Sequence, residues 1–276
     1  MMNYQGTGQS PVESIFNTVP RPWPFHVAGV DGCKAGWFVA IASARKQSDI
    51  AASCELTLKK VCIADTFADV LSKTIDCVLV CIDIPIALSN GDKPPECDVA
   101  ARKLLGKRAS SVFPAPVRPC LCAADYETAC KISFERSGKK LSKQSFALLK
   151  KIRQVDDVIT AALQCRVREI HPEVSFWVLN GKRPMPQNKK DPAGQAQRHR
   201  LLEGIFTDMD SVLAQAPTRG YVMDDALDAL VAAWTAGQAV LGKAKTLPEK
   251  PELDSKGLRM EMLMPLDDCF AWQLQD

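Results

Sequence analysis

The apolar positions in the first third of the chain predict four strands and one helix. Residues 25–32, 37–43 and 54–62 have the apolar or alternating patterns of strands, and the first of them ends at an aspartate before a glycine turn. Residues 66–74 have the spacing of a short amphipathic helix. The continuous apolar run at 76–85, closed by a proline, is typical of a central strand that is buried on both faces. The predicted order is β-β-β-α-β, an antiparallel meander followed by a helical crossover.

A basic helical region, about 91–165, interrupts this pattern. Residues 97–106 predict a helix closed by a glycine, in which Asp98 and Arg102 have the i,i+4 spacing of a surface pair. Residues 111–119 contain three prolines and are incompatible with a helix. Residues 139–153 carry six Lys or Arg and no acid, which predicts a basic helix. We therefore expect an insertion between the fourth and fifth strands.

The α/β pattern resumes after this insertion. The expected elements are a strand at 165–173, helices at 173–181, 193–206 and 223–242, and a late strand near 259–264. The helix at 223–242 has the clearest pattern, with an apolar face of small side chains suited to close packing. The expected fold class is α/β, a ribonuclease H-like mixed sheet (β-β-β-α-β-…-β-α) flanked by helices.

The composition is that of a folded protein with one main domain. The chain has 276 residues, of which 46% are hydrophobic and 24% charged. Residues 1–24 are rich in Pro, Gly and polar residues and predict a flexible leader, 25–242 form the domain, and 243–276 form a C-terminal tail. A net charge of +3 neither requires nor excludes a nucleic-acid partner.

The cysteines and the apolar segments indicate a cytoplasmic protein. The eleven cysteines include no Cys-x-x-Cys pair, so we expect reduced thiols that act as small core residues. Residues 1–24 lack the apolar stretch of a secretory signal. Residues 226–242 are too short and too acidic to span a membrane.

Two aspartates at strand ends are the first candidates for chemistry. Familiar phosphate, dinucleotide, zinc-protease and serine-hydrolase motifs are absent from the sequence. Asp31 ends the first predicted strand and Asp83 the fourth, and they would meet if these strands are neighbours. Carboxylates that converge are tolerated mainly around a divalent cation, and hard oxygen ligands suit Mg²⁺ or Mn²⁺. Alternatively, Asp31 forms a turn and Asp83 caps a loop.

Three further aspartates stand at the start of the late helix. Asp225 and Asp228 are three residues apart and share one face, and Asp224 precedes them. Asp224 and Asp225 could equally complement the helix dipole. Asp228 lies within the apolar part of the helix, which favours a role as a metal ligand.

Residues 169–173 form a second candidate group. Glu169, His171 and Glu173 alternate onto one face of the predicted strand. Glu173 could be a further metal ligand, and His171 a proton shuttle or a phosphate contact. The alternatives are a core histidine and an acid at a helix N-terminus.

Basic residues flank two predicted loops. Arg108, Arg118, Lys189 and Lys190 are the residues that we expect to hold substrate phosphates beside a carboxylate–metal site. Runs of this kind are also common on solvated surfaces.

Several segments together resemble a known family. They are GVDGCKAGW (29–37), CIDIPIAL (81–88), CDVAARKLLGKRASSVFPAPVR (97–118), EIHPEVSFWVLNG (169–181) and MDDALDALVAAWTA (223–236). In order and over roughly 25–240 they resemble the DUF429 family, a predicted nuclease group with a ribonuclease H-like fold.

The acidic residues are also similar to the Holliday-junction resolvase pattern. By that likeness the metal ligands would be Asp31, Asp83, Asp225 and Asp228. The basic insertion and the His-Pro-Glu segment depart from that pattern, which leaves the substrate open.

The predicted function is hydrolysis of nucleic-acid phosphodiester bonds at a two-metal carboxylate site. Asp31 would bridge both ions, Asp83 and Asp228 would each hold one, and Asp225 or Glu173 would complete the shell. The alternatives are an actin-like or sugar-kinase-related nucleotide-binding protein and a non-catalytic nucleic-acid or protein-binding module.

Overall fold

The computed structural model describes residues 23–46 and 54–266, so the predicted leader and the end of the predicted tail lie outside the described residues. The strands are β1 (Phe25–Cys33), β2 (Gly36–Lys46), β3 (Cys54–Ala64), β4 (Cys77–Ile82), β5 (Val167–Glu169), β6 (Phe206–Thr207), β7 (Ala244–Leu247) and β8 (Met262–Pro265). The α-helices are α2 (Phe67–Lys73), α3 (Glu96–Leu105), α4 (Tyr126–Ser137), α5 (Lys143–Asp156), α6 (Pro172–Leu179), α7 (Pro192–Glu203), α8 (Met209–Leu213) and α9 (Met223–Val240).

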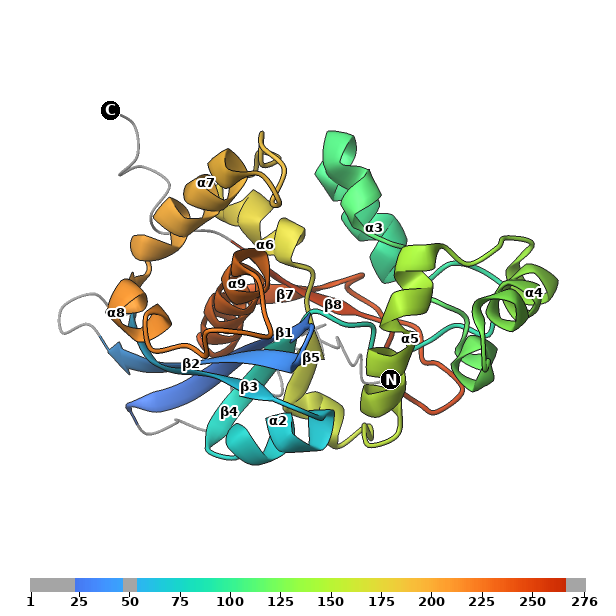
Figure 1. Cartoon of the computed structure of the whole chain (residues 1–276), viewed down its shortest axis with the longest axis horizontal. Helices are drawn as coiled ribbons and strands as arrows, with labels where there is room; N and C mark the ends of the chain where they lie inside the picture. Colours follow the sequence, from blue (N-terminus) through green and yellow to red (C-terminus); the bar gives the residue numbers. More distant parts are fainter. Residues whose placement is uncertain (1–22, 47–53, 267–276) are drawn as a thin grey trace, which may run out of the picture.

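A six-stranded mixed sheet forms the centre of the molecule (Figure 1). Its strand order is β5-β4-β1-β2-β3-β6. β1, β2 and β3 pair antiparallel, whereas β4 pairs parallel with β1 and β5 parallel with β4. α2 carries the chain from the β3 side of the sheet to β4. This arrangement confirms the predicted meander, the crossover and the α/β fold class with a mixed sheet flanked by helices.

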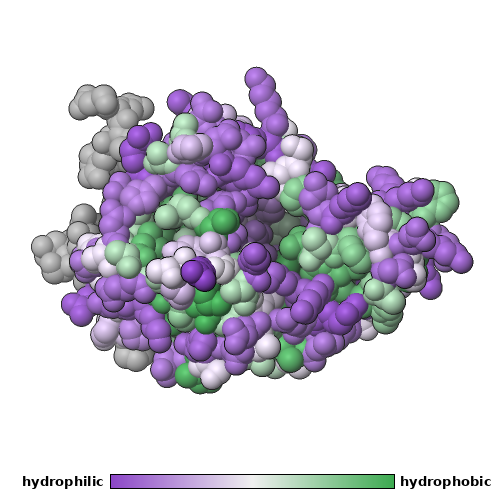
Figure 2. Space-filling model, viewed as in Figure 1, coloured by the Kyte–Doolittle hydropathy of each residue, from purple (hydrophilic) through white to green (hydrophobic). Residues whose placement is uncertain are grey.

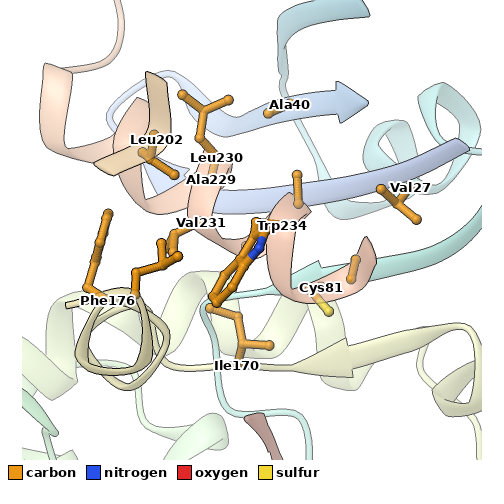
Figure 3. Packing of buried hydrophobic residues seen from close by; sticks show 14 of the residues in the cluster. Val27, Ala40, Cys81, Ile170, Phe176, Leu202, Ala229, Leu230, Val231 and Trp234 are labelled. Carbon is orange, nitrogen blue, oxygen red and sulfur yellow. The ribbon is translucent and has the colours of Figure 1, made fainter. Parts of the chain in front are cut away.

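α9 covers one face of the sheet because its side chains toward β1 are small. A Cβ atom at Gly29 would lie 1.9 Å from the carbonyl oxygen of Ala229 and 2.2 Å from the backbone nitrogen of Ala233. The helix backbone therefore rests directly on β1. Figure 3 shows Trp234 and Val231 of α9 among the apolar side chains of this core.

The opposite face of the sheet is covered by α2 and α5. Val30 and Val39, which alternate with the residues facing α9, pack with Phe67 of α2 and Ile152 of α5. Each face thus has its own apolar core, which explains why β4 is apolar along its whole length, Cys77–Ile82.

The predicted insertion contains more structure than the sequence pattern indicates. The basic helix expected at 139–153 is α5, but α4 was not predicted, because its apolar and polar residues have no clear helical period. Arg118 forms ion pairs with Asp156 of α5 and with Asp254, which joins the insertion to the segment after β7.

Three predicted elements differ from the structure. The strand expected at 165–173 is only β5, since Pro172 begins α6. The helix expected at 193–206 ends at Glu203, and the next residues form β6 at the edge of the sheet. In the predicted tail, β7 was not expected, and it pairs with β8, which corresponds to the late strand predicted near 259–264 and whose Leu263 is fully buried.

The described cysteines form no disulfide bond among the described residues. Five of them are buried: Cys33, Cys77, Cys81, Cys97 and Cys120. Within the described ranges, no helix has both the length and the apolar character needed to cross a bilayer.

Candidate functional site

A cavity of about 530 Å³ lies where the ends of β1 and β4 meet the insertion. Its walls come from the loop 110–116, from α5, from the start of α6 and from the loop 188–190. Figure 2 shows hydrophilic residues over most of the surface on this side of the molecule, with apolar patches between them. The cavity's size suits a small ligand or part of a larger one.

Asp31 and Asp83 lie side by side at the sheet end of the cavity. Val30 pairs with Ile82 in the parallel ladder of β1 and β4, and the backbone nitrogen of Asp83 donates to the carbonyl oxygen of Val30 at 3.0 Å. Asp31 is 8% exposed, and its Oδ1 accepts from the backbone nitrogen of Gly32 at 2.7 Å. β1 and β4 are neighbours, as the prediction required. This pairing brings Asp31 and Asp83 together, which the alternative roles as a turn residue and a loop cap do not require.

Asp228 reaches the same place from α9, because Gly29 lets this helix lie directly on β1. Asp228 is fully buried, and its Oδ2 accepts from Lys189 Nζ at 2.5 Å. Its Oδ1 is buried without a hydrogen-bond partner among the described residues. An unpartnered buried carboxylate oxygen is costly and indicates a missing cation or donor.

The three carboxylates lie close enough for their charges to influence one another. Burial raises the pKa of Asp31 well above its usual range, and the charges of Asp83 and Asp228 raise it further. Burial also raises the pKa of Asp83 to about 6 and that of Asp228 to about 6, although Lys189 opposes both shifts. Close carboxylates in a dry site resist ionising together, which is the condition that a divalent cation relieves.

Asp224 and Asp225 line the outer part of the cavity. Oδ2 of Asp225 accepts from the backbone nitrogen of Val222 at 2.9 Å, which caps the start of α9. Burial raises the pKa of Asp225. Asp225 therefore combines the capping role with a position beside the three inner carboxylates.

Glu173 lies at the start of α6 and is 7% exposed. Its Oε1 forms an ion pair with Arg198 of α7, whose side chain is 1% exposed. Glu173 lines the cavity with its charge already matched by a buried partner.

His171 precedes α6 and lines the cavity. Its Nε2 lies 3.3 Å from the carbonyl oxygen of Ser111, so that nitrogen must carry the hydrogen and donate it. Nδ1 is buried and has no partner among the described residues. Burial lowers the pKa of His171, so Nδ1 carries a lone pair at neutral pH.

Two buried acids extend the site toward the insertion. Oε2 of Glu169 accepts from the backbone nitrogen of Ile86 at 2.9 Å, and Oδ2 of Asp98 accepts from that of Ala115 at 3.0 Å. Asp98 is 5% exposed, which contradicts the expected surface pair with Arg102. In the sequence, only the nearby small apolar residues Cys97 and Ala101 pointed to this burial. Both are buried in α3.

The four predicted phosphate contacts lie in four different environments. Lys190 is exposed and lines the cavity. Arg108 also lines it, but its Nε and Nη2 donate to the carbonyl oxygens of Met185 and Pro186, each at 2.9 Å. Arg118 lies outside the cavity walls in its two ion pairs, and Lys189 binds Asp228.

The carboxylates of the cavity are not gathered as tightly as the ligands of a bound ion. Over residues 23–46 and 54–266, the three candidate ligand atoms that lie within 4.8 Å of one another are those of His199, Glu203 and Asp210, at the surface of α7 and α8. In the cavity wall, Lys189 Nζ lies 2.5 Å from Asp228 Oδ2. The unpartnered oxygen of Asp228 and the oxygen-rich donor set fit Mg²⁺ or Mn²⁺, provided that the carboxylates turn toward the ion.

Comparisons with known proteins give one family and one similar structure. A family model described as "Protein of unknown function (DUF429)" matches residues 29–253. A structure of RuvC from Thermus thermophilus is similar at 11% identity with a TM-score of 0.33, covering 79% of this chain and 97% of that chain. No curated protein shows significant sequence similarity to the chain.

Proposed function

The chain belongs to the DUF429 family, and we propose that its acidic cavity hydrolyses phosphodiester bonds in nucleic acid with the help of bound Mg²⁺ or Mn²⁺. The convergence of Asp31, Asp83 and Asp228 carries this proposal. They come from two strands and a helix, and one buried oxygen of Asp228 has no partner among the described residues. A divalent ion is the ligand whose charge and hardness match this set.

The ion, when bound, would activate water and stabilise the negative charge of the leaving oxygen. Asp31, Asp83 and Asp228 would hold it, with Asp225 at the open side of the site. Glu173, predicted as a ligand, would instead support the wall of the cavity through its ion pair with Arg198.

The other cavity residues have separate roles in the proposal. His171 Nδ1 would accept the proton of the attacking water, because this nitrogen is neutral and its ring is held by Ser111. The oxygen of that water forms the new bond to phosphorus as the bond to the leaving oxygen breaks. Lys190, exposed at the rim, would bind a phosphate next to the one that reacts.

A cleavage assay tests the proposal. End-labelled single-stranded, double-stranded, hybrid and branched DNA and RNA are incubated with Mg²⁺ or Mn²⁺, with wild type and Asp31→Asn side by side. Glu135→Gln, which changes an exposed acid of α4, is the matched control. We expect cutting by wild type and the control that chelation and Asp31→Asn abolish. Equal faint cutting by all three proteins would refute the proposal, and stabilisation by ATP would then favour a nucleotide-binding protein.

A further inference from the structure

The ammonium group of Lys189, a residue of the cavity wall, pairs with Asp228, which is buried behind that wall. Lys189 Nζ lies 2.5 Å from Asp228 Oδ2. The side chain of Lys189 is 36% exposed and lines the cavity, whereas Asp228 is completely buried beneath it. The same ammonium also interacts with the charges of Asp83 and Asp31. A positive charge of the protein itself therefore lies among the three inner carboxylates.

The backbone around Lys189 is fixed from two sides. Arg108 donates to the carbonyl oxygens of Met185 and Pro186, which precede the lysine in its loop. On the other side, a Cβ at Gly194 would lie 1.9 Å from the carbonyl oxygen of Asn188, so the start of α7 rests against the loop. The backbone that carries Lys189 is thus held in place on both sides of the lysine.

The charges of the four inner groups balance with one divalent ion. The three inner aspartates and Lys189 have formal charges that sum to −2 when all are ionised. One divalent ion neutralises these four groups, and Lys189 already supplies a positive charge beside Asp228. Asp225, which is partly exposed, and the buried acids Glu169 and Asp98 also line the cavity, so this balance is that of the inner groups alone.

We propose that Lys189 serves as a tethered cation that replaces the second divalent ion, so that the site holds one ion, for which Asp31, Asp83 and Oδ1 of Asp228 would be the ligands. This inference rests on the proposed metal-dependent function and changes its two-ion form. The lysine would stabilise negative charge on the leaving oxygen or on a phosphate from the Asp228 side. A cation fixed to the chain stays in place at any metal concentration, which a weakly bound second ion does not.

Titration calorimetry with Mn²⁺ alone tests the proposal. The proteins are wild type, Lys189→Met, Lys190→Met as a neighbouring loss of charge, and the double variant Lys189→Met with Asp228→Asn. We expect one ion per chain in wild type and in Lys190→Met. Lys189→Met should take up two ions, or bind one about tenfold more tightly, and the double variant should return to one.

Thermal melting in a chelator shows whether each variant folds. Without metal, Lys189→Met should melt below wild type, because Asp228 loses its partner, and Mn²⁺ should raise its melting temperature more than that of wild type. Two ions in wild type, or identical stoichiometry and affinity in wild type and Lys189→Met, would overturn the proposal. These measurements contain no nucleic acid. If wild type binds one ion as expected but cleaves no nucleic acid, only the proposed function is refuted. If wild type binds two ions and does cleave nucleic acid, only the proposed role of Lys189 is refuted.

Discussion

Gly29 of β1 touches the backbone of Ala229 in α9, with no room for even a methyl group between them. This contact sets the distance between the strand that carries Asp31 and the helix that carries Asp228. The geometry of the candidate site therefore depends on a residue without a side chain, two positions before the first carboxylate.

Gly29→Ala should destabilise the protein strongly, by about 3 kcal/mol or more, since its Cβ would meet the helix backbone rather than a flexible side chain. Denaturant unfolding measures the effect. The matched control is Gly204→Ala, where a Cβ would have an ordinary contact at 3.6 Å, and it should stay within about 1 kcal/mol of wild type. Wild-type stability in Gly29→Ala would contradict the direct packing of α9 on β1.

The metal-free protein should become less stable as the pH rises through 6. The folded pKa of Asp83, about 6, lies above the ordinary value of 3.8, so the folded chain binds more protons than the unfolded chain between these values. The stabilisation from this proton is present below pH 4 and is lost above pH 6. Asp83→Asn should reduce the loss of stability between pH 5 and pH 7.5 by about 1–3 kcal/mol.

Chemical unfolding in a chelator at the two pH values gives this difference directly. Glu135→Gln serves as the control and should keep the wild-type dependence, because this acid is exposed on α4. If the stability of Asp83→Asn depends on pH as that of wild type does, burial does not raise the pKa of this carboxyl in the folded protein.

Arg198→Met should cost about 3–5 kcal/mol, because it leaves Glu173 buried without its partner. Replacing both residues with methionine should recover most of this loss, since an apolar pair of similar size removes the uncompensated charge. Unfolding of the two single variants and the double variant forms the thermodynamic cycle. The double variant should also retain Mn²⁺ binding, and loss of the ion would instead identify Glu173 as a ligand.

His171→Gln should lower the rate of cleavage by about a hundredfold or more if Nδ1 accepts the proton from water. Mn²⁺ affinity should stay near that of wild type, which separates proton transfer from metal binding. His199→Gln changes a histidine on α7 that bonds to Asp210, outside the cavity, and is the control for the assay. An unchanged rate in His171→Gln would exclude this role.

Sequence patterns were sufficient for the parts of the site that lie on long, regular elements. Asp31 and Asp83 could be located because each ends an apolar strand, and Asp228 because it interrupts the apolar face of a long helix. Their convergence followed from one assumption, that the two strands are neighbours, and the ladder of β1 and β4 confirms it.

The conformations of loops and the long-range ion pairs could not be predicted from these patterns. Lys189 and Arg198 belong to a basic stretch whose composition suits a solvated surface, and only the packing of α7 shows that each has a buried acidic partner. β5 is too short to produce an alternating pattern that stands apart from α6. Asp98 matched the spacing of a surface pair, but the loop before Val117 folds over it.

The position of α9 late in the chain has a consequence for synthesis on the ribosome. β1, β2 and β4 are complete at Ile82, but the helix that covers their shared apolar face begins only at Met223, about 140 residues later. At a synthesis rate of roughly 5–20 residues per second, this apolar face remains uncovered for on the order of 7 to 28 seconds before α9 is made. During that interval the nascent sheet is a substrate for chaperones, and any chain released before α9 carries an open apolar face together with Asp31 and Asp83 but no Asp228.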